Sequence, residues 1–376
     1  MRINVFLQSC ALALLVSMGS GSALAENAWE KQPFDLDALI AAAKAEPPIT
    51  IYDTSGKVVG VAEGFTKKYG VEATGRKVDA NAQIDMIIRE AQSGNVQGDV
   101  VRLADGTAAA AQLLPEGFVE SWMPPNLADS VIAAYQDPLA LATNATVWVY
   151  NTEAYDHCPV NNIWQLTQPE WKDKVVINDP LSKGIYVDWF NQMSMHGDDK
   201  VAAAYEALNG KALATDEKSA TAAWVKAFAQ NHPVIVASDE GVADAVGAPG
   251  QKAPPFGLIS PSMFRHNADK GYKLGLCTDM QPWIGSTYVK AELIATGTKS
   301  PNAARLFVYY SLTDEGMKAL VADSNIPTNK DIALPKDNPS GLFEHVDQLL
   351  AYDLSTSVDD FDAREDWGDF WTLNYK

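Results

Sequence analysis

Two turns of this chain bring small polar residues, a glycine and a lysine to the predicted start of a helix. Thr54-Ser55-Gly56 follows the strand candidate 49–53, and Ser182-Lys183-Gly184 follows the strand candidate 174–178. Free backbone amides at a helix start attract anions, and the helix dipole strengthens that attraction. Lysine in a first helical turn opposes the dipole, so a bound anion would compensate for Lys183. We predict that the two turns bind one anionic group, such as a phosphate; simple N-capping by their hydroxyls is the alternative.

The turn Ser238-Asp239-Glu240 follows another short apolar run and offers hydrogen-bond acceptors. Paired acceptors select strongly for hydroxylated ligands, because a ligand without hydroxyl groups would leave them buried and unpaired. The alternative is that Ser238 only caps the next helix. Trp283 could stack on a sugar ring or fill the core. We include these four residues among the candidate ligand-binding positions.

No motif of a common catalytic class is present. The sequence contains no G-x-S-x-G, no H-E-x-x-H, no P-loop, and no G-x-G-x-x-G after a strand. Its five histidines never take the i, i+4 spacing of metal-binding helices. We therefore expect a binding protein that is not an enzyme, with no cofactor and no metal site. An exported enzyme of a different class is the remaining alternative.

The elements that position these turns alternate in a way typical of α/β proteins. Short β-branched runs alternate with amphipathic stretches from Ile49 onward, which predicts a largely parallel sheet covered by helices. We expect strands at 49–53, 71–78, 99–103, 140–150, 174–178, 233–237, 256–260 and 284–295. We expect helices at 57–69, 80–93, 106–113, 183–195, 199–208, 215–230, 240–246, 301–310 and 313–322.

The length and strand order predict two lobes. A chain of 376 residues exceeds the ~250–300 residues at which one core stops growing. The runs 140–150 and 256–260 are expected to cross between lobes as hinge strands, with a ligand cleft between the lobes. We therefore assign 46–142 and 259–322 to lobe 1, and 143–258 and 323–376 to lobe 2 with a C-terminal extension.

The first residues have the order of a secretory signal peptide. Arg2 precedes the apolar run 5–16, and Ala23-Leu24-Ala25 precedes Glu26, so we expect residues 1–25 to be removed near Ala25 and the protein to be periplasmic. Lipid attachment at Cys10 is a weaker alternative. The rest of the chain has 28 basic and 48 acidic residues, which argues against nucleic acid and anionic membranes as partners.

Two cysteines remain after the expected cleavage. Cys158 and Cys277 can pair in an oxidising compartment, and a disulfide and two buried free thiols are both compatible with the sequence.

Several short motifs recur at these intervals in one known family. They are Ile51-Tyr52-Asp53-Thr54-Ser55-Gly56, Gly98-Asp99-Val100-Val101, Ala104-Asp105-Gly106, Val149-Tyr150-Asn151-Thr152, Ile177-Asn178-Asp179-Pro180, Lys299-Ser300-Pro301-Asn302-Ala303-Ala304-Arg305 and Ile326-Pro327-Thr328. Over roughly residues 49–331 the chain resembles the extracellular solute-binding proteins of bacterial ABC importers, in the group close to periplasmic ferric-ion-binding proteins.

The resemblance implies a type II periplasmic-binding-protein fold, a monomer that captures a small solute and delivers it to an ABC permease and its ATPase. It also implies that Asp105 and Asn144 face the cleft. Members that bind hexose phosphates use a His/Asp pair and a further acid for sugar hydroxyls, which we map to His196, Asp198 and Glu240; His196 and Asp198 could equally only cap helices.

The ligand that we predict is a phosphorylated sugar or a similar polyol phosphate. Ferric binders of this group use adjacent tyrosines, whereas the one Tyr-Tyr pair here, Tyr309-Tyr310, falls in a predicted helix outside lobe 2. Hard oxygen ligands for Fe³⁺ are otherwise not evident as a cluster. A polyamine binder, using Asp53, Asp239, Glu240 and Trp283 as an acidic and aromatic cage, is the other alternative.

Overall fold

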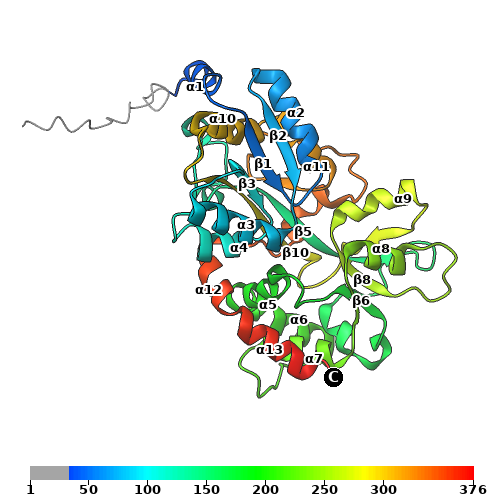
Figure 1. Ribbon diagram of the computed structural model, residues 1–376. Helices are drawn as coiled ribbons and strands as arrows, with labels where there is room; N and C mark the ends of the chain where they lie inside the picture. The colour runs from blue at the N-terminus through cyan, green and yellow to red at the C-terminus, as the bar shows by residue number, and fades with distance from the viewer. Residues whose placement is uncertain (1–33) are drawn as a thin grey trace, which may run out of the picture.

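The computed structural model describes residues 34–376, except for the side chain of Asn81. The expected signal peptide lies outside this range. Figure 1 shows two lobes joined by long central strands. One mixed sheet runs through both lobes in the order β2-β1-β3-β10-β5-β8-β6-β7. In the described part of the chain, no helix has the length and apolar character required to cross a bilayer.

Lobe 1 has three parallel strands with helices on both faces. The strands are β1 (Ile49–Asp53), β2 (Ala73–Lys77) and β3 (Val100–Leu103). The helices are α1 (Leu36–Ala43), α2 (Val58–Tyr69), α3 (Ala80–Ser93), the short α4 (Gly106–Ala108) with the wide turn that follows it, α10 (Pro301–Ser311) and α11 (Asp314–Ala322). One hydrophobic core packs around Phe65 and Phe307. A smaller core forms where Tyr52 of β1 meets apolar side chains of α3 and of the turn after α4.

Two long antiparallel strands pass between the lobes. They are β5 (Ala140–Asn151) and β10 (Gly285–Ala295), paired from Ala140 opposite Ala291 to Val147 opposite Gly285. Beyond this overlap β5 pairs with β8, and β10 pairs with β3 and with the short β4 (Val119–Glu120). The short β11 (Ile326–Pro327) also pairs with β5. These strands hold the lobes on either side of a cleft.

Lobe 2 repeats the layered arrangement. Its strands are β6 (Val175–Asn178), β7 (Val234–Val236), β8 (Phe256–Ile259) and β9 (Leu274–Leu276), and its helices are α5 (Gly184–His196), α6 (Asp198–Asn209), α7 (Ala220–Gln230), α8 (Asp239–Gly247) and α9 (His266–Asp269). Its core is aromatic: the ring of Trp224 stacks on Phe228, and Trp148 stacks on Phe256.

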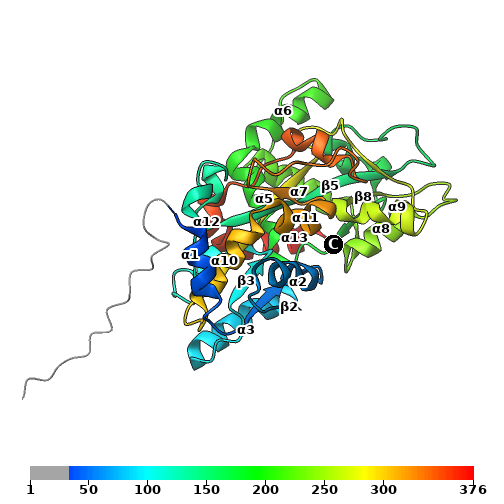
Figure 2. The same cartoon turned by 90° about the horizontal axis from the view of Figure 1, so that it is seen from above.

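The C-terminal segment completes the core of lobe 2. Trp367 and Trp371 of α13 (Arg364–Asn374) are each 2% exposed and pack against Phe190 of α5. The preceding helix, α12 (Ser357–Asp362), lies between α4 and α5 (Figure 1). Seen from above, the lobes and these terminal helices form one compact arrangement (Figure 2).

The lobe boundary differs from the sequence-based prediction at one crossing. Ile259 ends β8 inside lobe 2, and the chain returns to lobe 1 through β10. Residues between these strands, among them Phe264 and Trp283, belong to the core of lobe 2. The residues after 323, which we assigned to lobe 2, are also divided between the two lobes, because Ile332 packs in the core of lobe 1. A buried strand and a hinge strand have the same apolar composition, so the sequence did not distinguish them.

The sheet is mixed rather than largely parallel, because β10 runs antiparallel to both neighbours. Cys158 and Cys277 form a disulfide that joins the loop after β5 to the end of β9.

Candidate functional site

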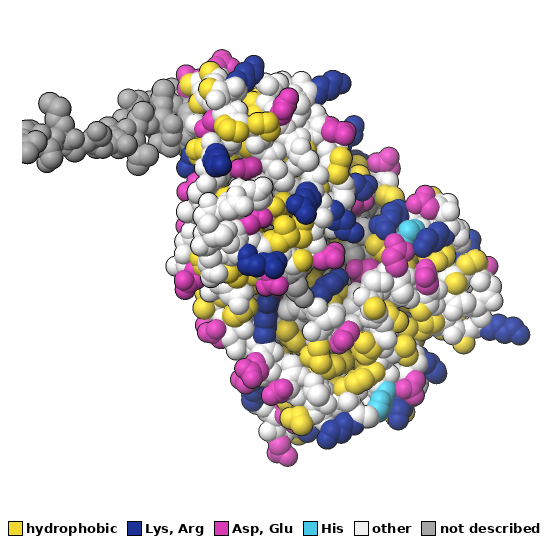
Figure 3. All heavy atoms as spheres, in the orientation of Figure 1, with side chains coloured by type: hydrophobic (Ala, Val, Ile, Leu, Met, Phe, Trp, Pro, Cys, Tyr) yellow, Lys and Arg dark blue, Asp and Glu magenta, His cyan; other side chains and the backbone are white. Residues whose placement is uncertain are grey.

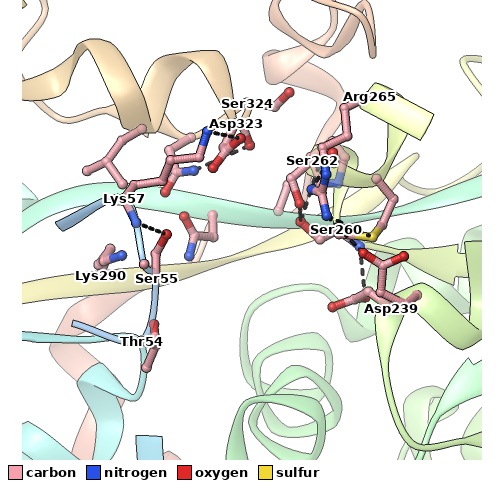
Figure 4. Close-up of a pocket in the computed structure, with 18 of the residues that line it drawn as sticks. Thr54, Ser55, Lys57, Asp239, Ser260, Ser262, Arg265, Lys290, Asp323 and Ser324 are labelled. Carbon is pink, nitrogen blue, oxygen red and sulfur yellow. Dashed lines mark hydrogen bonds and ion pairs between the residues drawn. The ribbon is translucent and has the colours of Figure 1, made fainter. Parts of the chain in front are cut away.

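A cavity of about 700 Å³ lies between the lobes. Its lining comes from the strand ends of both lobes and from the hinge. Lobe 1 contributes Thr54, Ser55, Gly56, Lys57, Lys77, Leu320, Asp323, Ser324 and Asn325, the hinge contributes Asn144, Ala145 and Lys290, and lobe 2 contributes Lys183, Ser238, Asp239, Glu240, Ser260, Pro261, Ser262, Met263 and Arg265. Figure 4 shows Ser55 and Lys57 on one side, with Ser262 and Arg265 facing them across the cavity.

The cavity has the opposite charge balance to the whole chain. Four lysines and one arginine line it against three acids, although the chain carries a net charge of −19. In the space-filling view, basic and acidic side chains gather on both sides of the junction between the lobes (Figure 3). A cleft with a local excess of positive charge concentrates anions whatever the net charge of the protein.

Three of these basic groups already have acidic partners. Lys57 Nζ lies 3.5 Å from Asp323 Oδ1, and Arg265 donates to Glu240 Oε1 at 2.9 Å. Lys290 donates to the buried Asp53 at 2.7 Å. Because these three basic groups are paired within the protein, less of their positive charge is available to a ligand.

Lys77 and Lys183 differ from the other cavity lysines. Neither forms an ion pair or a side-chain hydrogen bond with any residue between 34 and 376. Lys77 ends β2 in lobe 1, and Lys183 is the N-cap residue of α5 in lobe 2. Two unpaired ammonium groups therefore reach one cavity from opposite lobes.

The turn after β1 is organised by Asp53. Asp53 Oδ1 accepts a hydrogen bond from the Ser55 amide at 3.0 Å, and Ser55 Oγ accepts one from the Lys57 amide at 3.2 Å. Helix α2 begins after Lys57 without a side-chain cap. The predicted residues Thr54, Ser55 and Gly56 all line the cavity. The amides of Val58 and Val59 at the start of α2 donate to the carbonyl oxygens of Ser55 and Gly56, so they are engaged within the turn.

The turn before α5 is arranged differently from our prediction. Lys183 lines the cavity, but Ser182 and Gly184 do not. The guanidinium group of Arg364 lies against Gly184, where an added Cβ would sit 2.1 Å from its Cζ. A cation from the C-terminal segment therefore already stands beside the first turn of α5, which the sequence assigned to an anion.

The acidic turn before α8 contributes all three predicted residues. Ser238 Oγ accepts from the Gly241 amide and caps α8. Asp239 Oδ1 accepts from the Ser260 amide and from Asn178 Nδ2, both at 3.0 Å. Each of these side chains therefore has a structural role and also lines the cavity.

Glu240 is held by three basic neighbours. A hydrogen bond from His266 is the main cause that lowers the pKa of Glu240, and Lys270 acts in the same direction. Arg265 is the third neighbour. Glu240 therefore stays ionised and positions Arg265 at the cavity wall.

One unsatisfied acceptor belongs to Asn144 of the cavity lining, and a second belongs to Asn178 beside Asp239. Asn144 Oδ1 and Asn178 Oδ1 are buried and have no hydrogen-bond donor within the described residues. Tyr186 and Tyr288 lie close to them and to Asp239, and burial, followed by the charge of Asp239, raises the pKa of both tyrosines. A ligand with hydroxyl groups could supply donors here.

Besides Ser182 and Gly184, four further predicted residues lie away from the cavity. His196 and Trp283 line a second cavity near Tyr352, and His196 Nε2 is hydrogen-bonded to Thr356 Oγ1 at 3.0 Å. Asp198 accepts hydrogen bonds from the first amides of α7. Asp105 caps α4 and pairs with Arg364. In each case a capping or packing partner outside the cavity holds the side chain.

The sequence analysis missed several cavity residues. Lys77 is the last residue of β2, and ligands of open α/β sheets bind at the carboxyl ends of parallel strands, so its position in the sequence could have identified it. Arg265 and Lys290 gave no local signal, and Asp323, Ser324 and Asn325 reach the cavity only because α11 ends at the hinge.

The described residues offer no cluster of three or more His, Cys, Asp or Glu side chains for a metal. Tyr309 and Tyr310 lie in α10, and Tyr310 is 3% exposed and packs edge-on against Phe65 and Tyr69. Tyr310 is therefore part of the lobe 1 core.

A family model described as bacterial extracellular solute-binding protein matches residues 53–323. No curated protein sequence matches the chain significantly. Iron-bound HitA from Pseudomonas aeruginosa is 17% identical, with a TM-score of 0.66 over 86% of this chain and 99% of that one.

Two further solved structures have the same fold. The substrate binding protein of the ABC transporter from Agrobacterium tumefaciens is 12% identical, with a TM-score of 0.65 over 90% of this chain and 97% of that one. A Trichodesmium protein (IdiA, FutA) in complex with iron and citrate is 15% identical, with a TM-score of 0.63 over 88% and 100%. These likenesses show the two-lobed type II periplasmic-binding-protein architecture.

Proposed function

This chain belongs to the bacterial extracellular solute-binding protein family, and we propose that it is the substrate-binding subunit of an ABC importer. Its proposed ligand is an anionic solute, a sugar phosphate or similar polyol phosphate. The observation that carries this proposal is the pair of unpaired lysines, Lys77 and Lys183, which line one cavity from opposite lobes. The permease and its ATPase would receive the solute from the closed form.

An anion between these lysines favours lobe closure. Each lysine belongs to a different lobe, so a phosphate that contacts both is bound more tightly when the lobes approach each other. Charge-assisted hydrogen bonds are the strongest polar contacts that the cavity can offer. The Ser55 hydroxyl, whose oxygen accepts from the Lys57 amide, can donate its own proton to the same group.

The remaining lining suits hydroxyl groups. Ser260, Ser262, Ser324 and Asn325 provide neutral donors and acceptors, and Asp239 provides a charged acceptor. The orphan acceptor of Asn144 at the base of the cleft would be satisfied by a hydroxyl donor. A polyol with one phosphate matches both the charged and the neutral parts of the cavity.

A ferric-ion ligand is the second candidate, because Tyr186 and Tyr288 lie near Asp239 of the cavity wall, although neither tyrosine lines the cavity itself. Fe³⁺ prefers such hard ligands. However, the pKa of both tyrosines is raised, so iron would have to displace their protons. Binding by this cluster predicts a visible absorption band when ferric citrate is added.

Thermal unfolding of the protein beginning at Glu26 tests the proposal. We would add hexose phosphates, inorganic phosphate, free hexoses, spermidine and ferric citrate separately. A ligand that binds only the native form raises the Tm, by an amount that grows with its concentration over Kd. We expect a shift with hexose phosphates and none with free hexoses. A shift with spermidine alone would reject the anionic ligand.

The site of action is proposed as the periplasm, after cleavage near Ala25. N-terminal sequencing of the exported protein would identify the first residue. A mature chain that retains residues 1–25 would contradict the cleavage.

A further inference from the structure

Arg364 of the C-terminal segment contacts both lobes at once. Its Nη2 donates to Asp105 Oδ1 and to Asp188 Oδ2, each at 2.7 Å, and its Nη1 and Nε add bonds of 3.1 Å and 2.8 Å to the same two carboxylates. Asp105 follows β3 in lobe 1, and Asp188 belongs to α5 in lobe 2. A planar guanidinium group suits two carboxylates in this way, whereas a lysine does not.

A second contact joins the same segment to the same turn of lobe 1. The Tyr352 hydroxyl is hydrogen-bonded to Thr107 Oγ1 at 2.9 Å and donates to the fully buried Asp360 at 2.8 Å. Thr107 lies two residues after Asp105, so both contacts meet lobe 1 at the turn that begins α4.

The segment itself is anchored in lobe 2. Trp367 Nε1 donates to Asn191 Oδ1 at 3.0 Å, and Asn191 and Gln192 both donate to Asp360. Trp367 and Trp371 are buried in the core of that lobe. Helix α13 must therefore move with lobe 2. Because α12 and Tyr352 also contact lobe 1 through α4 and Tyr135, the contacts with Asp105 and Thr107 are among those that change when the lobes rotate about β5 and β10.

We propose that Arg364 and Tyr352 form an interlobe latch, which holds the lobes in the arrangement of this structure by binding Asp105 and Thr107. The latch lies outside the cavity and acts through lobe position, so Arg364 is a positioning residue. Gly184 makes room for it, because any side chain there would overlap the guanidinium group. The latch does not depend on which solute is bound.

Distance measurement on the ligand-free full chain tests the latch. Spin labels on cysteines introduced at the exposed positions Lys67 of lobe 1 and Lys211 of lobe 2 report lobe separation by pulsed electron resonance. We expect R364Q to add a second population at another separation, with the ratio of the two arrangements changed by about tenfold or more. The matched control is R89Q, because Arg89 is exposed and bonds only to its own helix.

Two further variants keep the test decisive. R364K retains the positive charge but lacks the planar guanidinium group, and we expect its distance distribution to lie between those of wild type and R364Q. Near-ultraviolet circular dichroism shows whether R364Q folds. If it does not, Y352F serves in its place, because this variant keeps the packed ring and loses only the hydroxyl. Wild-type distance distributions in a folded R364Q, or in Y352F if R364Q does not fold, would overturn the latch. Solute binding plays no part in this readout, so its failure is distinct from failure of the proposed ligand.

Discussion

Lys290 Nζ lies 2.7 Å from Asp53 Oδ1, and these two buried side chains join the hinge strand β10 to the turn that lines the ligand cavity. Arg102 Nη1 stands 3.7 Å from the other oxygen of Asp53. The carboxylate therefore organises the Thr54-Ser55-Gly56 turn, while Lys290 and Arg102 together balance its charge and that of the buried Glu292, to which Arg102 donates at 3.2 Å.

Replacing Lys290 is expected to destabilise the fold. K290M leaves Asp53 without its closest cation, and breaking a buried pair in this way costs roughly 3 kcal/mol. Urea denaturation measures the loss. The control is K57M, because the pair of Lys57 with Asp323 is largely exposed and should contribute less than about 1 kcal/mol. Equal losses in the two variants would show that burial of the Lys290 pair does not matter.

Removing either unpaired lysine is expected to weaken binding of the anionic ligand. K77Q and K183Q should each reduce affinity for a hexose phosphate by about tenfold or more, because each loses a hydrogen bond to a charged group. Titration calorimetry at two salt concentrations measures the effect, which should shrink at high salt. K67Q, an exposed lysine outside the cavity, should bind like wild type. Retained affinity in both K77Q and K183Q would exclude these lysines as ligand contacts.

The contribution of Asp188 to the stability of the protein is expected to fall between about pH 4 and pH 6. Burial raises the pKa of Asp188 to about 6, and Arg364 opposes that rise. The folded state thus keeps a proton that the unfolded state has already lost, so this stabilisation is complete below about pH 3.8 and is lost as the pH rises through about 6.

The variant D188N isolates this effect. The unfolding free energy of wild type minus that of D188N should decrease by about 3 kcal/mol from pH 3.5 to pH 7. Denaturation series at several pH values measure the difference. A difference that is constant over this range would contradict the raised pKa.

Loss of the disulfide is expected to destabilise lobe 2. Cys158 and Cys277 are separated by 119 residues, and removing a cross-link over such a long loop typically costs 2–5 kcal/mol. The double variant C158S/C277S, made in the chain that begins at Glu26, should show this loss in denaturant. Wild type should also label with maleimide only after reduction and unfolding. Prompt labelling of the native protein would mean that the bond does not form.

Regular elements were largely predictable because local patterns determine them. The eight strand candidates and nine helix candidates all correspond to observed elements, since buried strands and amphipathic helices carry their own periodicity. The aromatic helix α13 was not assigned, because Trp367 and Trp371 lie among many acids and their burial depends on contacts with α5 and α7.

The site was predictable where a strand end determines it and not where tertiary packing does. Thr54, Lys183 and Asp239 follow strands and line the cavity as their positions suggested. His196 and Asp198 looked equally polar, but each finds a partner at a helix end. Arg364 occupies the start of α5 from 180 residues away along the chain, and no local pattern could reveal that.

The dependence of both cores on late segments affects how the protein can fold during synthesis. Lobe 1 needs α10 and α11, and lobe 2 needs Trp367 and Trp371, which lie within the last ten residues. A nascent chain that stops before α13 leaves Phe190 and Phe228 exposed to solvent on one side. Lobe 2 therefore reaches its final state only after α13 has been synthesised, and a product that stops before this helix would present an aromatic surface for quality-control proteases.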